Sequence, residues 1–406
     1  MSYDRATVDL LPAAPSSIPA AYATEERLAI RDLAREFAMR EVLPAANELD
    51  PVQGLIPERI RTQMAEMGFF GILIPERYGG LGLGLFEYCL VTEELARAWM
   101  SVASIIARGN GLGGGFSEAQ REELLPKVAR GEWLGAFALS EPDAGADIAS
   151  IRTRAERDGD DWLINGQKMW CTFADQADFL IVVARTTPFD PTNRHAGIRN
   201  FYVPKERDGF PPGISGNPIR KIGYHGWKTW ELSFSDLRVP GDALLGQERP
   251  SGDSNSGFRN VSRGLSSARV HTAARSIGLA RGALEDSIGY VQQRRQFDRP
   301  IGEFQAIRFK IAKMAAEVES CRALMYQVAA DAEVGRQVDA QASMVKYLAS
   351  EMAERVTSEA LQIHGGAGYT TDLPIERYWR DARLTKIFEG TSEIQLRIIS
   401  DRHLPR

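Results

Sequence analysis

Residues 307–328 read IRFKIAKMAAEVESCRALMYQV, and their apolar side chains recur every three or four positions. The recurring positions are Ile307, Ile311, Met314, Val318, Cys321, Met325 and Val328. This spacing predicts one long helix with a single apolar stripe. The preceding segment repeats the pattern at Ala273, Ile277, Ala280, Leu284, Ile288 and Val291. With further helical segments expected near 345–361 and 394–399, the pattern predicts an antiparallel four-helix bundle over residues 249–406.

The middle of the chain has a different pattern. Between residues 133 and 248, short alternating or β-branched runs are separated by turn signals. At this density they predict a small β-barrel or sandwich rather than βαβ units. Residues 23–132 have helical spacing again, and the proline-containing residues 1–22 are expected to form a flexible arm rather than a targeting peptide. The predicted fold is α+β, with helical, β and helical domains in that order.

The composition narrows the class of protein. The 406 residues include 49 Lys and Arg against 54 Asp and Glu, a mildly acidic balance that argues against nucleic-acid binding. Apolar runs such as 179–184 are far shorter than the ~20 residues of a membrane span. Cys89, Cys171 and Cys321 form no disulfide framework, and the five histidines lack metal-site spacing. We therefore expect a soluble cytoplasmic protein without a bound metal.

Five motifs, in order, resemble those of the acyl-CoA dehydrogenase family. They are FALSEPDAGAD (137–147), NGQKMWCT (165–172), RRQF (294–297), QIHGG (362–366), and RD (380–381) followed by FEGTSEIQ (388–395). They extend over nearly the whole chain and fit the predicted layout. The resemblance, most similar to the short-chain, medium-chain and dicarboxylic group, implies an FAD-dependent oxidoreductase that dehydrogenates an acyl-CoA.

The resemblance also implies how FAD is bound, since the chain has no dinucleotide fingerprint following a predicted strand. The backbone of Phe137, Leu139 and Ser140 and the side chain of Thr172 would contact the flavin ring. Trp170 would pack against it, although a plain core aromatic is the alternative. The remaining implied cofactor residues are Arg294, Phe297, Gln305, Gln362, Gly365, Gly366, Thr391 and Glu393. In the family some of these contacts cross a subunit boundary, so a homodimer or homotetramer is expected.

Glu389 is the candidate base. Dehydrogenation across Cα and Cβ needs a group that takes the α-proton, and a carboxylate in a desolvated site can have its pKa raised for that role. Glu389 matches the usual base position of the family, with Phe388 and Gly390 beside the substrate. The second base position found in the family is Ala268 here, so it offers no competitor. Without the motif, a surface glutamate would be the alternative.

Two departures concern the CoA moiety. Ala146 replaces the usual serine near the CoA phosphates, and Ser266 replaces an acidic residue three positions before Arg269. Both changes leave open whether CoA or a carrier-protein thioester is the substrate. Asp298 also departs from the family pattern, which usually has glycine after the phenylalanine.

Arg108 is the candidate specificity residue. The resemblance places it at the floor of the acyl pocket, next to the apolar Ile105 and Ile106. A guanidinium there predicts a dicarboxylic or branched acyl group of the methylsuccinyl or benzylsuccinyl type. A surface arginine in a salt bridge is the alternative.

One loop suggests the redox partner, and other outcomes remain open. Residues 80–83, Gly-Leu-Gly-Leu, resemble the apolar patch on which an electron-transferring flavoprotein docks, the alternative being a buried turn. Oxidases and desulfinases share the fold, but loss of the base would be their signature. A nucleic-acid-binding flavoprotein is disfavoured by the net charge of −5.

Overall fold

The computed structural model describes residues 18–111, 113–246 and 256–404, so most of the expected N-terminal arm lies outside it. The chain divides into two compact units. One, here the helical unit, takes residues from 1–53, 85–104 and 269–406; the other, here the sheet unit, takes residues from 54–84 and 105–268. The predicted N-terminal helical segment therefore contributes to both units.

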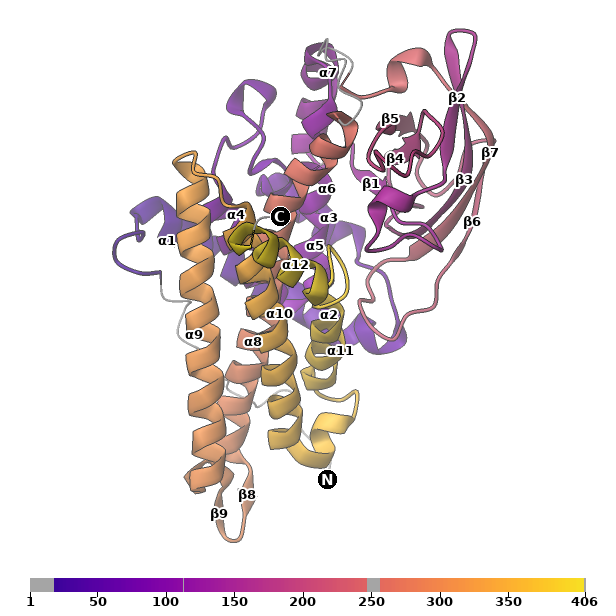
Figure 1. The fold of residues 1–406 in the computed structure, drawn as a ribbon. Coiled ribbons are helices and arrows are strands. Elements are labelled where there is room, and N and C mark those ends of the chain that lie inside the picture. The colour runs from indigo at the N-terminus through magenta and orange to yellow at the C-terminus, as the bar shows by residue number, and fades with distance from the viewer. Residues whose placement is uncertain (1–17, 112, 247–255, 405–406) are drawn as a thin grey trace. The chain divides into compact units, whose positions relative to one another are not determined.

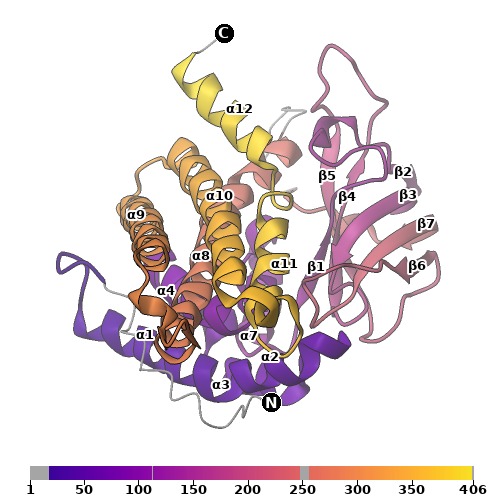
Figure 2. The same cartoon turned by 90° about the horizontal axis from the view of Figure 1, so that it is seen from below.

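Helices, several of them long, form the helical unit. They are α1 (Glu25–Phe37), α2 (Leu43–Leu49), α4 (Leu85–Ala98), α8 (Ser256–Gln293, from residue 269 on), α9 (Gln305–Glu333), α10 (Asp339–His364), α11 (Ile375–Thr385) and α12 (Ser392–His403). Helix α10 packs against α9, α11 and α12, and α4 packs against α1 and α9. Viewed end-on, α8, α9, α10 and α11 lie side by side (Figure 2). The helical C-terminal part is thus confirmed, although α11 was not predicted and α12 is short.

The apolar stripe of α9 is a core face, as its spacing predicted. Met314, Val318, Met325 and Val328 are buried. Helix α8 differs from the predicted single apolar stripe. Residues 269–284 are buried on every side of the helix, and partly exposed residues follow them toward its end. Its buried positions include charged side chains, which need partners within the unit.

The sheet unit contains strands β1 (Gly135–Ala138), β2 (Arg154–Asp158), β3 (Asp161–Thr172), β4 (Phe179–Arg185), β5 (Ile198–Pro204), β6 (Ile214–Pro218) and β7 (Thr229–Val239). Within the described chain they form one sheet in the order β1-β4-β2-β3-β7-β6, and β5 pairs with β4. Strands β3, β7 and β6 fan out beside β4 and β5 (Figure 1). Helices α3 (Glu58–Glu66), α6 (Ala107–Asn110) and α7 (Glu118–Ala129) complete this unit, while α5 (Met100–Ile105) lies at the division.

The long pairing of β3 with β7 is interrupted twice. Its register shifts between Ile164 and Gly166 and again between Lys168 and Cys171. A bulge re-aims the side chains around it and is frequent next to active sites. The second shift contains Trp170, one of the residues expected to contact the flavin.

Residues 18–111, 113–246 and 256–404 lack two features that would point to other functions. None of their helices is long and apolar enough to cross a membrane. None of their His, Cys, Asp and Glu side chains gather in a group of three or more that could hold a metal ion.

Candidate active site

Glu389 lies in the turn between α11 and α12, in an unusual backbone conformation. Its φ is +53° and that of Gly390 is +89°. A left-handed glutamate costs about 1–3 kcal/mol, and such strain is concentrated at functional sites. Two side chains fix the turn by donating to the carbonyl of Gly390: Lys346 Nζ at 2.6 Å and Gln395 Nε2 at 2.9 Å.

The Glu389 carboxylate is bound by helix α8 through both of its oxygens. Arg275 Nη2 donates to Oε1 at 2.6 Å, and Thr272 Oγ1 donates to Oε2 at 2.6 Å. The Glu389 side chain is 30% exposed, whereas that of Arg275 is 1% exposed. The carboxylate is therefore the accessible member of a pair whose cation is buried.

Arg275 is fixed from several sides. Its Nη1 donates to Ser104 Oγ at 2.9 Å and its Nη2 also donates to Thr272 Oγ1 at 2.8 Å. The guanidinium lies 4.6 Å from the centroid of the Phe388 ring, within cation–π range. On the same helix, His271 Nε2 lies 3.1 Å from the carbonyl of Ala103. The guanidinium is held in place independently of Glu389.

Without a bound substrate, the Glu389 carboxyl does not have the raised pKa that is expected once the site is desolvated on binding. Burial raises the pKa of the carboxyl, but the charges of Arg275 and His271 and the hydrogen bonds from Thr272 and Arg275 lower it by more. The net pKa of Glu389 is below its usual value. The Glu389 carboxyl is therefore ionised at neutral pH, and its partners weaken its affinity for a proton.

Lys346 is buried behind the turn. The pKa of Lys346 is lowered to about 8, mainly by burial. The positive charges of Arg275 and Arg269 also lower this pKa, whereas the negative charges of Glu389 and Glu351 raise it. A lysine in the unfolded chain has a pKa near 10.5. Between these values the unfolded chain binds more protons than the folded one, so stability rises with pH in that window.

We expect Lys346→Met to remove this pH dependence. From pH 8 to 10.5 the free energy of unfolding of the wild type should rise by up to roughly 3 kcal/mol relative to the variant, at 1.36 kcal/mol per pKa unit. Below pH 8 the difference between them should be constant. Urea unfolding of both proteins across this range measures it, and parallel curves would show that Lys346 has an ordinary pKa.

The residues expected to contact the flavin ring come together in the sheet unit. Met169 N donates to the carbonyl of Ser140 at 2.8 Å, which joins β3 to the segment after β1. The buried Lys168 Nζ donates to the carbonyl of Leu139 at 2.8 Å and to Glu141 Oε1 at 2.8 Å, fixing that segment. Thr172 Oγ1 lies 3.1 Å from Thr229 Oγ1.

Trp170 is not a core aromatic. Its side chain is 57% exposed, and its φ of +63° lies in the left-handed region. An exposed indole held out from a bulge, beside the backbone of Leu139 and Ser140, suits a flat ring system. Phe137 and Leu139 pack at the edge of a small buried cluster beneath this surface.

The remaining expected cofactor residues divide into two groups. Thr391 and Glu393 lie at the start of α12, close in sequence to Glu389, and Thr391 Oγ1 accepts a hydrogen bond from Ile394 N. The other group is at the far end of α10: Arg294, Phe297, Gln305, Gln362, Gly365 and Gly366. The rings of Tyr290 and His364 stack there, with their centroids 4.2 Å apart.

These two groups are far apart in one protomer. Lys346, which contacts Gly390, and His364 are 18 residues apart on α10, or about 27 Å at 1.5 Å per residue. In Figure 1 the hairpin of β8 (Arg295–Gln296) and β9 (Arg299–Pro300) is correspondingly remote from α12. A Cβ placed on Gly365 or Gly366 would meet nothing within 4 Å, so the backbone here is open to a ligand.

The hairpin itself presents an aromatic side chain. Phe297 is 88% exposed, and both Phe297 and Asp298 have positive φ. Asp298, which stands where the family usually has glycine, therefore still adopts the turn conformation that glycine favours.

The expected substrate residues lie in both units. Ala146 is exposed in the sheet unit. Arg269 begins the buried part of α8. Burial lowers the pKa of its guanidinium, and the negative charge of Asp339 partly offsets this shift. Arg108 lies in α6 of the sheet unit and is partly buried. Burial raises the pKa of the Cys171 thiol to about 12, and the positive charge of Arg108 counteracts part of this rise. The structure therefore places Arg108 and Glu389 in different units.

The loop 80–83 is held by backbone hydrogen bonds. Leu81 N donates to Gly71 O at 2.8 Å and Leu83 N to Ile72 O at 2.9 Å. The Leu81 side chain is nevertheless exposed. The loop is a rigid turn with an apolar side chain at its surface.

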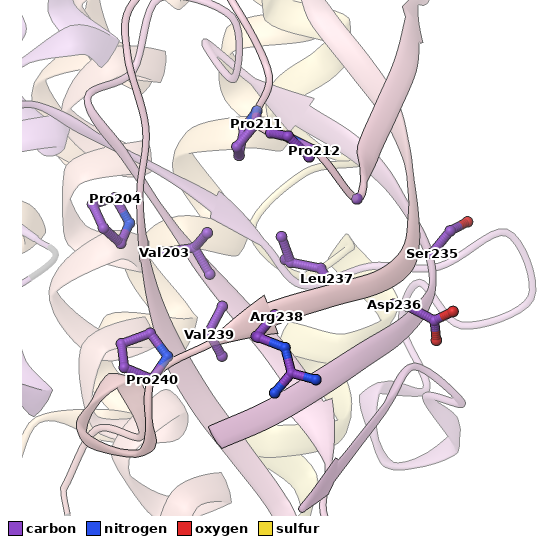
Figure 3. Close-up of a pocket in the computed structure, with 11 residues that line it drawn as sticks. Val203, Pro204, Pro211, Pro212, Ser235, Asp236, Leu237, Arg238, Val239 and Pro240 are labelled. Atoms are coloured by element: carbon purple, nitrogen blue, oxygen red, sulfur yellow. The ribbon is translucent and has the colours of Figure 1, made fainter. Parts of the chain in front are cut away.

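A separate hollow of about 440 Å³ lies in the sheet unit (Figure 3). Its lining includes Val203, Pro204, Pro211, Pro212, Leu237 and Pro240, which lie around it in the figure. It contains none of the expected site residues.

Sequence reasoning missed Thr272, Arg275 and Lys346. A signal was present in α8, where Thr272 and Arg275 are three positions apart and therefore share a face of the helix. Which carboxylate they bind could not be read from the helix alone.

Comparisons with known proteins agree with this architecture. Models described as the N-terminal, middle and C-terminal domains of acyl-CoA dehydrogenase match residues 24–132, 136–237 and 255–404. The (2S)-methylsuccinyl-CoA dehydrogenase of Cereibacter sphaeroides is 39% identical over 390 residues, covering 94% of this chain and 70% of that protein. The 3-(aryl)acrylate reductase of Clostridium sporogenes is 38% identical over 386 residues, covering 94% and 99%. The structure of butyryl-CoA dehydrogenase from Megasphaera elsdenii matches with a TM-score of 0.87 and 33% identity, covering 94% and 99%.

Proposed function

Because the chain belongs to the acyl-CoA dehydrogenase family, we propose that it removes two hydrogens from Cα and Cβ of an acyl-CoA, with Glu389 as the base. Members of this family are FAD-dependent oxidoreductases. The observation that carries the proposal is the Glu389 carboxylate in a strained turn, bound by Arg275 and Thr272, with Lys346 fixing the turn.

FAD, when bound, supplies the acceptor for the hydride that leaves Cβ. The carboxylate of Glu389 takes the proton from Cα, and the electron pair of that C–H bond becomes the new Cα–Cβ double bond. The turn from Phe388 to Gly390 positions the carboxylate and its backbone groups beside the thioester. Oxidase and desulfinase outcomes are less well supported, since the base is present and ordered.

The residues present fit FAD. Trp170 offers an exposed ring, Thr172 follows it on β3, and the neighbouring Lys168 and Met169 fix the backbone of Leu139 and Ser140. Arg294 suits a pyrophosphate because a guanidinium donates two parallel hydrogen bonds. Gly365 and Gly366 leave room for a close approach.

We further propose a homodimer or homotetramer, with FAD bound between protomers. The support is that the Arg294 and Gly365 group lies about 27 Å along α10 from the Glu389 turn within one protomer. Exposed Phe297 and Phe309 also offer apolar surface to a second copy.

Arg294→Ala is expected to lower FAD content and oligomer stability together, because a ligand bound across an interface stabilises the assembly by linkage. Flavin absorbance per chain and light scattering measure both quantities. Arg336→Ala, which alters an exposed arginine paired with Asp331, is the matched control. A wild-type monomer with full FAD would contradict the proposed assembly.

The acyl group is proposed to be branched or dicarboxylic. The support is the identity with a relative named (2S)-methylsuccinyl-CoA dehydrogenase and the presence of arginines at candidate pocket positions. Arg108 remains one such candidate.

The family favours CoA over a carrier-protein thioester. The exposed Leu81 loop is the proposed docking site of an electron-transferring flavoprotein. A cytoplasmic location fits the three free cysteines.

A further inference from the structure

We propose that Arg275 is the receptor for the substrate's own carboxylate, and that this carboxylate replaces Glu389 on the guanidinium when the substrate binds. The inference rests on the proposed dehydrogenation and names the substrate class: monothioesters of 1,4-dicarboxylic acids. It assigns the specificity role to Arg275 rather than to Arg108.

A buried cation such as Arg275 is costly unless an anion pairs with it. Arg275 is 1% exposed, and the anion that it contacts at 2.6 Å is Glu389. Removing the anionic partner of a buried charge is strongly unfavourable. If Glu389 turns toward a substrate with an alkyl chain, Arg275 loses this partner. A substrate that brings a carboxylate restores it.

Of the two paired side chains, Glu389 rather than Arg275 is the one that moves. Arg275 is tied to Ser104 and Thr272 through separate hydrogen bonds, and it stacks on Phe388. Glu389 is more exposed and precedes a glycine in a left-handed turn. An incoming anion can therefore displace the Glu389 carboxylate, while the guanidinium stays where it is.

The exchange also affects the base. With the guanidinium taken by the substrate, Glu389 loses its main neutralising partner and gains a neighbouring negative charge. Both changes favour its protonated form, as does exclusion of water by the bound acyl group. The exchange thus strengthens Glu389 as a proton acceptor only when the correct substrate is present.

The position of Arg275 also sets the length of the acyl group. The receptor directly contacts the base, and the base must reach Cα. The substrate carboxylate must therefore lie close to Cα, as in a succinyl-type chain, where two C–C bonds of about 1.5 Å separate the two carbons. Longer diacids would carry their carboxylate past Arg275.

The test compares two substrates that differ at one group. In (2S)-methylsuccinyl-CoA a carboxylate stands where 2-methylbutyryl-CoA has a methyl group. We expect the FAD-loaded wild type to prefer the first in kcat/KM, and Arg275→Gln to lower this preference by at least about 30-fold. Arg275→Lys keeps the charge but loses the planar fork, so it should recover part of the preference. Arg336→Gln is the matched surface control, with flavin content and circular dichroism as checks of folding.

The outcomes separate this inference from the proposed function. If no acyl-CoA reduces the flavin of the wild type, the proposed function fails. If both thioesters reduce it but the preference is absent, is unchanged in both Arg275 variants, or collapses in Arg108→Leu instead, the dehydrogenase stands and the role of Arg275 is overturned. Should the Arg275 variants not fold, the wild type alone decides: a preference for glutaryl-CoA or adipyl-CoA over (2S)-methylsuccinyl-CoA contradicts the proposed length.

Discussion

Glu389→Gln is expected to lower the kcat of dehydrogenation by about 10³-fold or more, in line with the 10²–10⁴-fold contributions of general bases. Glutamine keeps the size of the side chain and can still accept a hydrogen bond from Thr272 or Arg275, but it cannot take the α-proton. The FAD content and the affinity for the thioester should stay near those of the wild type.

The control for this variant is Glu359→Gln, which alters a partly exposed carboxylate paired with Lys310 far along α10 from the base. Steady-state turnover with a dye acceptor and flavin absorbance give the two readouts. Turnover of Glu389→Gln near the wild-type rate would show that another group removes the proton. A loss of FAD along with activity would instead show that the carboxylate has a structural role.

Arg281→Met should destabilise the helical unit by about 3–5 kcal/mol, the usual cost of removing one partner from buried charges. Arg281 is buried on α8 and binds the buried carboxylates of Glu93, at 3.1 Å, and Glu94, as well as the partly buried Glu285, at 3.5 Å. Arg322 still binds Glu93 at 2.9 Å, and Arg35 contacts Glu94 at 3.4 Å.

Urea unfolding at neutral pH measures this effect, with Arg336→Met as the control for loss of an exposed arginine. A change below about 1 kcal/mol would mean that the carboxylates relax or take up protons. The expected loss concerns a broken network, and it does not imply that the ion pairs are more stable than apolar packing.

Much of the fold could be predicted from side-chain periodicity. The long stripe of α9 has the buried face that its spacing indicates, and the alternating runs became β3, β4, β5 and β7. Helix α11 was missed because its buried face combines apolar side chains with Arg377 and Asp381, so it has no apolar run to detect. Charged groups become core residues only through partners that a sequence does not display.

The candidate site was predicted in part. Glu389 could be found because its motif is local, but its partners could not. Arg275 is 114 residues away in sequence and Lys346 contacts the turn across 44 residues, so tertiary packing alone brings them together. For the same reason the sequence did not show that Arg275 lowers the pKa of Glu389 before a substrate binds.

The exchange proposed for Arg275 gives a reason for this lowered pKa. A base that is weakened until its substrate arrives combines recognition with activation, since one guanidinium serves first Glu389 and then the substrate. The acyl specificity and the basicity of Glu389 would then depend on the same contact.

The most direct test of the central claim is an anaerobic titration of the FAD-loaded protein with (2S)-methylsuccinyl-CoA and with alkyl acyl-CoAs, followed by flavin absorbance. The account predicts that an acyl-CoA bleaches the oxidised flavin as it is dehydrogenated, with (2S)-methylsuccinyl-CoA the most effective, and that Glu389→Gln binds the same thioester without bleaching. A flavin that stays oxidised with every acyl-CoA would contradict the assignment of this chain as an acyl-CoA dehydrogenase.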